Sequence, residues 1–85
     1  MKLPVIKSLT EFIGQHDEDY VNECIEVLEH VSQAKGLSDE ELDTIGELLS
    51  NMYGSLEVSK MVKEGKSDKD ALNHFMKRVV GSIDK

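Results

Sequence analysis

The 85-residue sequence has few of the residues that anchor small folds: one cysteine, no tryptophan and four aromatic side chains in all. A single cysteine excludes an intramolecular disulfide, and so few aromatic rings mean that the core must be mostly aliphatic. A chain of this length without such staples is only marginally stable and has room for one hydrophobic core. We therefore expect a single helical domain over residues 1–85.

Long apolar runs are also missing. No segment approaches the roughly 18 consecutive apolar residues of a membrane span. The N-terminal residues 1–7 contain a lysine at each end of their short apolar stretch, which is not the pattern of a signal peptide. We expect a cytoplasmic protein with no membrane contact, whose one thiol stays reduced.

Basic residues are scarce where acidic residues are dense. Residues 11–57 hold thirteen acids and a single base, Lys35, and the net charge of the whole chain is −7. Because a nucleic-acid-binding protein must neutralise phosphates with a basic surface, we exclude nucleic acid as a partner. Residues 58–85 hold seven bases against four acids. We expect this basic segment to lie near the acidic region, in the same chain or in a partner copy.

Apolar residues recur at steps of three and four throughout, and no run alternates as a strand would. The sequence predicts an all-α fold with four helices. The first covers about 3–13, the second runs from an N-cap at Asp17 or Asp19 to about 35, the third covers 38–65 and the fourth starts at Ser67. The second helix is expected to bury a stripe of Val21, Cys24, Leu28 and Val31. The last helix is expected to present Leu72, Phe75, Met76, Val79 and Ile83 to the core.

The third segment, 38–65, has the pattern of a central helix. It opens with a capping box, in which Ser38 is the N-cap and Glu41 lies three positions on. One apolar face is made by Leu42, Ile45, Leu49, Met52 and Leu56. A second stripe of small and apolar residues climbs a different side. An element with two faces to bury belongs in the middle of the fold, so we expect the other helices to pack around it.

A helix of 28 residues spans about 40 Å and would protrude from a compact domain of this length. Two arrangements resolve the conflict: a kink near Gly54 and Ser55, or a straight helix that buries its far half against a second subunit. We favour the second arrangement and expect a homodimer. The predicted interface comprises Gly46, Ser50, Gly54, Val58, Met61 and Val62.

No motif in the sequence predicts catalysis, a cofactor or a metal site. Cys24 lies on the apolar side of its helix among acids, which is typical of a buried structural thiol. Glu26 with His30, and Asp70 with His74, are spaced four apart and could each offer two metal ligands. The Glu-x-x-His spacing of helical di-iron sites is absent, however. We therefore expect a non-enzymatic protein with no metal or cofactor.

Three stretches of the sequence resemble a small family of bacterial all-helical proteins of unknown function. They are the opening residues 1–6 (MKLPVI), residues 45–48 (IGEL) leading to 54–58 (GSLEV), and the ending 81–85 (GSIDK). The resemblance implies a helical domain and no particular activity.

We expect the protein to act by self-association or by binding another protein. Two alternatives stay open. The apolar faces that contain Met52, Met61 and Met76 could enclose a small or lipid-like ligand, because methionine adapts to irregular surfaces. The chain could also be an acidic adaptor for a basic partner protein.

Overall fold

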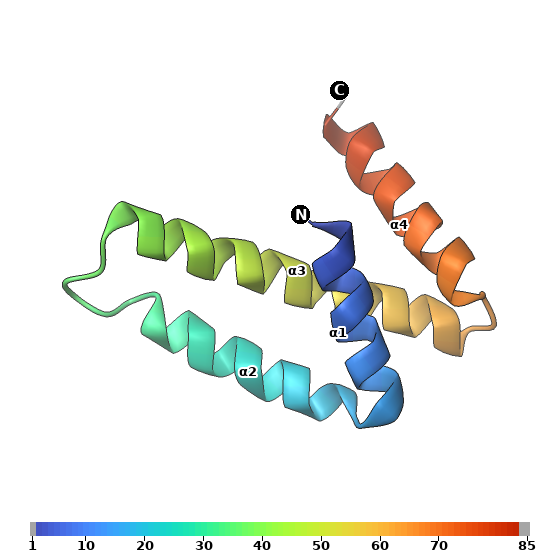
Figure 1. Ribbon diagram of the computed structural model, residues 1–85, viewed down its shortest axis with the longest axis horizontal. Coiled ribbons are helices and arrows are strands. Elements are labelled where there is room, and N and C mark those ends of the chain that lie inside the picture. Colours follow the sequence, from blue (N-terminus) through green and yellow to red (C-terminus); the bar gives the residue numbers. More distant parts are fainter. Residues whose placement is uncertain (1, 84–85) are drawn as a thin grey trace.

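The computed structural model describes residues 2–83, with side chains described over 2–78. These residues form four helices and no strand, which confirms the all-α prediction (Figure 1). The helices are α1 (Leu3–Gln15), α2 (Glu18–Val31), α3 (Asp39–Lys63) and α4 (Asp68–Ile83).

The predicted helix starts are confirmed in detail. The Ser38 hydroxyl accepts a hydrogen bond from the Glu41 amide, and the Glu41 carboxylate accepts one from the Ser38 amide. Asp17 caps α2, and the Ser67 hydroxyl accepts from the Asp70 amide at the start of α4. Each of these contacts satisfies an amide that the first helical turn leaves unpaired.

The helix ends were predicted less well. Helix α2 ends at Val31, four residues before the predicted end at Lys35, and the chain then turns through Gly36. Gly36 and Gly65 have φ of +90° and +109°, a region that side-chain-bearing residues rarely adopt, and each lies in a turn next to α3. Gly14, by contrast, does not end its helix, because α1 continues to Gln15.

Helix α3 is central, as predicted, because each of the other three helices packs against it. Two separate hydrophobic clusters lie on different sides of it. The first comprises Ile6, Val58, Ala71, Leu72 and Phe75, with Met61, Val62 and Met76 packed against it. The second comprises Ile13, Val21 and Ile25, with Leu49, Met52 and Leu56 packed against it. The predicted apolar positions Val79 and Ile83 of α4 have side chains outside the described residues.

Helix α1 crosses α3 and contributes to both clusters, through Ile6 to the first and Ile13 to the second (Figure 1). Its start is fixed by Asn51 of α3, whose side-chain oxygen accepts a 2.9 Å hydrogen bond from the Lys2 amide. The Asn51 side-chain nitrogen donates to the Glu47 carbonyl at 2.8 Å, so this buried amide is satisfied on both sides.

The molecule is a slab with extents of 44 × 35 × 17 Å. Helix α3 has 25 residues and runs for about 38 Å along the long dimension without interruption. Both sequence-based arrangements of α3 are therefore unnecessary, because α2 covers one apolar side and α1 and α4 cover the other. The thin shape has a consequence, since a helix at the edge of the slab keeps a large side in contact with water.

Candidate functional site

The predicted subunit interface must be corrected at its centre. A Cβ atom placed on Gly54 would lie 2.9 Å from Phe75 Cζ of α4 and 3.5 Å from Ile6 Cδ1 of α1. Val58 is fully buried in the same cluster. The space beside Gly54 is therefore filled by the Phe75 and Ile6 side chains of the same chain. Gly54 and Val58 thus have no surface to offer a second subunit.

The other predicted interface residues divide into two groups. Met61 and Val62 are half-buried and pack against the first cluster, so they too serve the core of this chain. Gly46 and Ser50 are exposed, and nothing lies within 4 Å of a Cβ placed on Gly46. Of the six predicted interface residues, Gly54 and Val58 are therefore buried and Met61 and Val62 half-buried within this chain, and the homodimer itself stays a prediction.

An unexpected apolar surface lies on the outer side of α2. Tyr20, Cys24, Val27 and Val31 are all exposed, and Tyr20 and Val27 keep 59% and 60% of their surface in contact with water. At about 100° per residue these four side chains fall within about 60° of one another on the helix. We refer to Tyr20, Cys24, Val27 and Val31 as the outer stripe.

The outer stripe shows that the predicted buried stripe of α2 was partly wrong. Helix α2 has apolar residues around nearly half its circumference, and the predicted buried stripe included Cys24 and Val31. The structure instead buries Val21 and Ile25 and half-buries Leu28. These three lie about 100° around the helix from the outer stripe. The prediction that Cys24 is a buried structural thiol is wrong, because its side chain is exposed.

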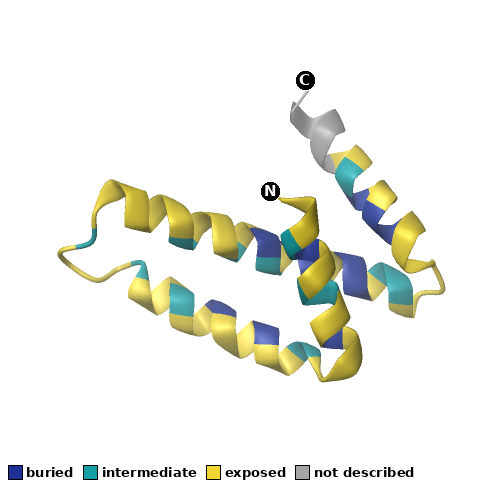
Figure 2. Ribbon diagram, in the orientation of Figure 1, coloured by how far each residue is buried: buried dark blue, intermediate teal, exposed yellow. Residues whose placement is uncertain are grey.

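An aromatic group extends the outer stripe at its N-terminal end. The ring of Phe12 on α1 lies 4.4 Å from that of His16 and 5.7 Å from that of Tyr20, measured between centroids. The Phe12 and Tyr20 rings meet edge to face, a favourable geometry for aromatic pairs. These contacts hold Tyr20 in place although its ring is largely exposed. The contact between Phe12 and Tyr20 therefore extends the outer stripe to the end of α1, and Figure 2 shows most of α2 as exposed.

Acidic side chains border the outer stripe. Asp19, Glu23 and Glu26 lie about 100° farther around α2, on the side away from the core. A shallow hollow is lined by Glu23, Glu26, Val27, His30 and Val31. Among the described side chains, no ion pair joins Glu23 or Glu26 to a base. The acidic border is thus available to an external cation.

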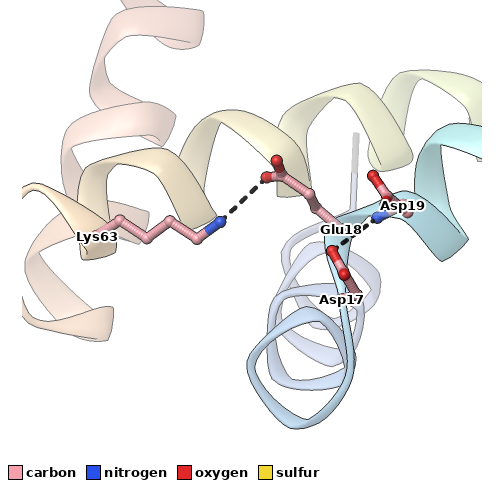
Figure 3. Close-up of polar contacts among 4 residues, drawn as sticks. All are labelled: Asp17, Glu18, Asp19 and Lys63. Atoms are coloured by element: carbon pink, nitrogen blue, oxygen red, sulfur yellow. Dashed lines mark hydrogen bonds and ion pairs between the residues drawn. The ribbon is translucent and has the colours of Figure 1, made fainter.

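Two bases of residues 58–85 form ion pairs with acids of residues 11–57, which agrees with the prediction that the basic segment lies near the acidic region. Lys63 of α3 donates to Glu18 at 3.2 Å, and Arg78 of α4 pairs with Glu57 of α3. Figure 3 shows the Lys63 side chain reaching across to Glu18 at the start of α2, beside the Asp17 cap. These groups are about half exposed, so each pair adds little stability.

The Glu18–Lys63 pair lies at an open cleft of about 550 Å³ between the end of α1 and the ends of α3 and α4. The cleft is lined by Thr10, Glu11, Ile13, Gly14, Gln15, His16, Asp17, Glu18, Ser59, Val62, Lys63 and Asp68. Its lining combines side chains of both charges with the apolar Ile13 and Val62. The sequence did not predict this cleft, because it forms where residues 10–18 meet residues 59–68.

The methionine residues do not enclose a common pocket. Met61 and Met76 pack against the first hydrophobic cluster, whereas Met52 packs against the second, on another side of α3. The alternative of a ligand site bounded by all three methionines therefore has no counterpart in the described part of the chain. Here methionine fills gaps at the edges of two small cores.

The titratable groups have simple surroundings. Within residues 2–83, no group of three or more histidine, cysteine or acidic side chains is placed to hold a metal ion. The pKa of Tyr53 is raised because its hydroxyl donates a hydrogen bond to Glu29 and so keeps its proton. The pKa of Glu41 is lowered because the Ser38 amide and hydroxyl hold its charged form in the capping box. Both shifts arise at exposed surface contacts between or within helices.

Comparison with known proteins places the chain in one family. Residues 1–84 match the model of a family of unknown function, DUF6952, and the chain belongs to that family. No curated protein and no solved structure matches it. None of the helices in the described part of the chain is both long and apolar enough to cross a membrane.

Proposed function

We propose that this member of the DUF6952 family acts by associating with another polypeptide chain, without catalysing a reaction. The observation that supports the proposal is the outer stripe on α2. Contiguous exposed apolar surface is typical of protein contact sites, whereas isolated exposed apolar residues are ordinary. The aromatic group at one end adds Tyr20 and Phe12, large side chains of the kind enriched at interfaces.

The energetic reason for association is the burial of this stripe. Val27 and Tyr20 contribute little to the fold of the isolated chain, since more than half of each remains hydrated. Covering them removes apolar surface from water, at about 25 cal/mol per Å² before the costs of binding. We propose the cytoplasm as the compartment, because the exposed thiol of Cys24 stays reduced there.

The test compares the native chain with a Tyr20→Ser, Val27→Ser double variant. Light scattering at micromolar concentration reports association with a second copy, and copurification from the native cell reports a different partner. We expect the native chain to have a partner in one of these experiments and the double variant to lose it. A Leu3→Ser variant is the control, because Leu3 is also exposed but lies on α1 away from the stripe.

A native chain that is monomeric in solution, and that copurifies with nothing the double variant lacks, contradicts the proposal. Both substitutions are at exposed positions, so the double variant should keep the helical content of the native chain and lose only about 1 kcal/mol of stability through the Phe12–Tyr20 contact. Circular dichroism checks this requirement before the association experiments are interpreted.

A further inference from the structure

We propose that the outer stripe of α2 is the docking surface for a basic amphipathic helix of a different protein. The inference rests on the proposed function and names the partner's chemistry. It is carried by two features that occur together on α2: the spacing of the stripe and the charge of its border.

The spacing favours a helix as the occupant. Tyr20, Cys24, Val27 and Val31 are separated by four, three and four residues. This is the spacing of the apolar seam in helix pairs, where each side chain inserts between side chains of the facing helix. Over these twelve residues the seam is about 17 Å long, or three turns. A facing helix of similar length can cover it completely.

The border favours a basic occupant. Asp19, Glu23 and Glu26 lie along the side of the stripe that faces away from the core, and none of the described bases pairs with Glu23 or Glu26. A helix that docks on the stripe brings its flanking positions next to these carboxylates. Lysine or arginine at those positions gains attraction along the seam and is also steered toward the surface during encounter.

The same charges disfavour a second copy of this chain. When two α2 helices pair in antiparallel fashion about a two-fold axis, their acidic borders meet on the same side of the seam. Asp19, Glu23 and Glu26 of each copy then face like charges, which is unfavourable. Each copy also carries a net charge of −7, so repulsion acts at longer range as well. A basic partner avoids both costs.

The experiment uses the full chain and two synthetic peptides of about 20 residues, because shorter isolated helices are marginal in water. Both peptides carry leucine at the same seam spacing. One has lysine at the flanking positions and the other has glutamate. Binding is measured by calorimetry at about 50 mM and about 300 mM salt, since screening distinguishes charge attraction from apolar contact.

We expect the lysine peptide to bind at least about tenfold more tightly than the glutamate peptide at low salt, with a smaller ratio at high salt. Val27→Ser should weaken binding by about tenfold, because it removes the central apolar contact. Glu26→Lys should reduce the preference for the lysine peptide. Asp43→Lys makes the same change of charge on a part of α3 away from the stripe and should leave most of the preference intact.

Cys24 gives a second, local measurement. It is the only cysteine in the chain, is exposed, and lies within the stripe. Bound lysine peptide should therefore slow its alkylation by iodoacetamide, while the glutamate peptide at the same concentration should not.

The inference is overturned by no binding of the lysine peptide, by equal binding of both peptides, or by equal loss of binding in Val27→Ser and in Leu3→Ser. A native dimer that Val27→Ser dissociates also overturns it, because the stripe then takes a second copy. That last result supports the proposed function, so the two ideas fail separately.

Discussion

The two halves of α3 have different roles although they form one continuous helix. Every buried residue of α3 lies in the second half: Asn51, Gly54, Ser55, Val58 and Ser59. There α1 and α4 close over the helix, and small residues let them approach. In the first half the apolar side chains are at most half-buried, and Figure 2 shows that the hairpin formed with α2 is largely exposed.

The difference indicates that stability and binding depend on different surfaces of the molecule. Residues 51–63 contribute Val58 to the first cluster, where α1 and α4 pack, and Met52 and Leu56 to the smaller second cluster, where α2 packs. Residues on the outer side of the hairpin are consequently released from packing and can serve binding. In this 85-residue slab, stability and association thus depend on different sides of the α2–α3 hairpin.

The largest predicted effect tests the second half of α3, where α1 and α4 pack against it. Phe75→Ala should lower the free energy of unfolding by about 3–5 kcal/mol, because Phe75 is buried against Ile6, Val58 and Gly54 and truncation leaves a cavity. On the outer side of α2, Val27→Ala should change the free energy of unfolding by no more than about 0.5 kcal/mol, since Val27 is largely exposed. Urea denaturation followed by circular dichroism measures both values. Similar losses in the two variants would contradict this difference.

A second, smaller effect compares two glycines of α3. Gly54→Ala should destabilise the fold by about 1–3 kcal/mol, because the new Cβ lies 2.9 Å from the Phe75 ring and the packed core must shift. Gly46→Ala should stabilise it by about 0.5–1 kcal/mol, because its Cβ meets open space and alanine favours the helix. Thermal melts should therefore shift in opposite directions. A shift of the same sign in both variants would show that the halves of α3 are packed alike.

The sequence predicted the elements well because they depend on local chemistry. The capping box of Ser38 and Glu41 and the caps at Asp17 and Ser67 are set by hydrogen bonds within one turn. Period-3.6 patterns likewise located all four helices and the central place of α3. Family membership, expected from short stretches at both ends and the middle, was confirmed over residues 1–84.

The sequence could not determine which apolar face meets which neighbour. Helix α2 offers seven apolar positions, and packing against Ile13 of α1 and apolar residues of α3 buries Val21 and Ile25 but not Cys24. Gly54 was predicted to face a second subunit, but the pattern does not show that the Phe75 ring of α4 fills the space beside it. Both errors concern tertiary arrangement, and together they hid the candidate site on α2.

The smallest predicted effect concerns the exposed start of α3 and depends on pH. The carboxylate of Glu41 accepts a 2.9 Å hydrogen bond from the Ser38 amide, so its pKa in the folded chain is lowered from 4.5. A lowered folded pKa means that the stabilisation is fully present above the unfolded pKa and is lost as the pH falls through the folded value. The melting temperature of Glu41→Gln should therefore lie below that of the native chain near neutral pH, by a margin that closes as the pH falls below 4.5.

Glu40→Gln is the matched control for this measurement, because it removes a charge from the same helical turn without touching the hydrogen bonds between Ser38 and Glu41. A margin that stays constant with pH, or one that Glu40→Gln reproduces, would assign the effect to general charge near the helix start. The second half of α3 has no part in this contact. A pH-dependent loss of melting temperature that only Glu41→Gln shows therefore locates an acid-sensitive stabilising contact in the first turn of α3, at the end of that helix farthest from the buried cluster around Phe75.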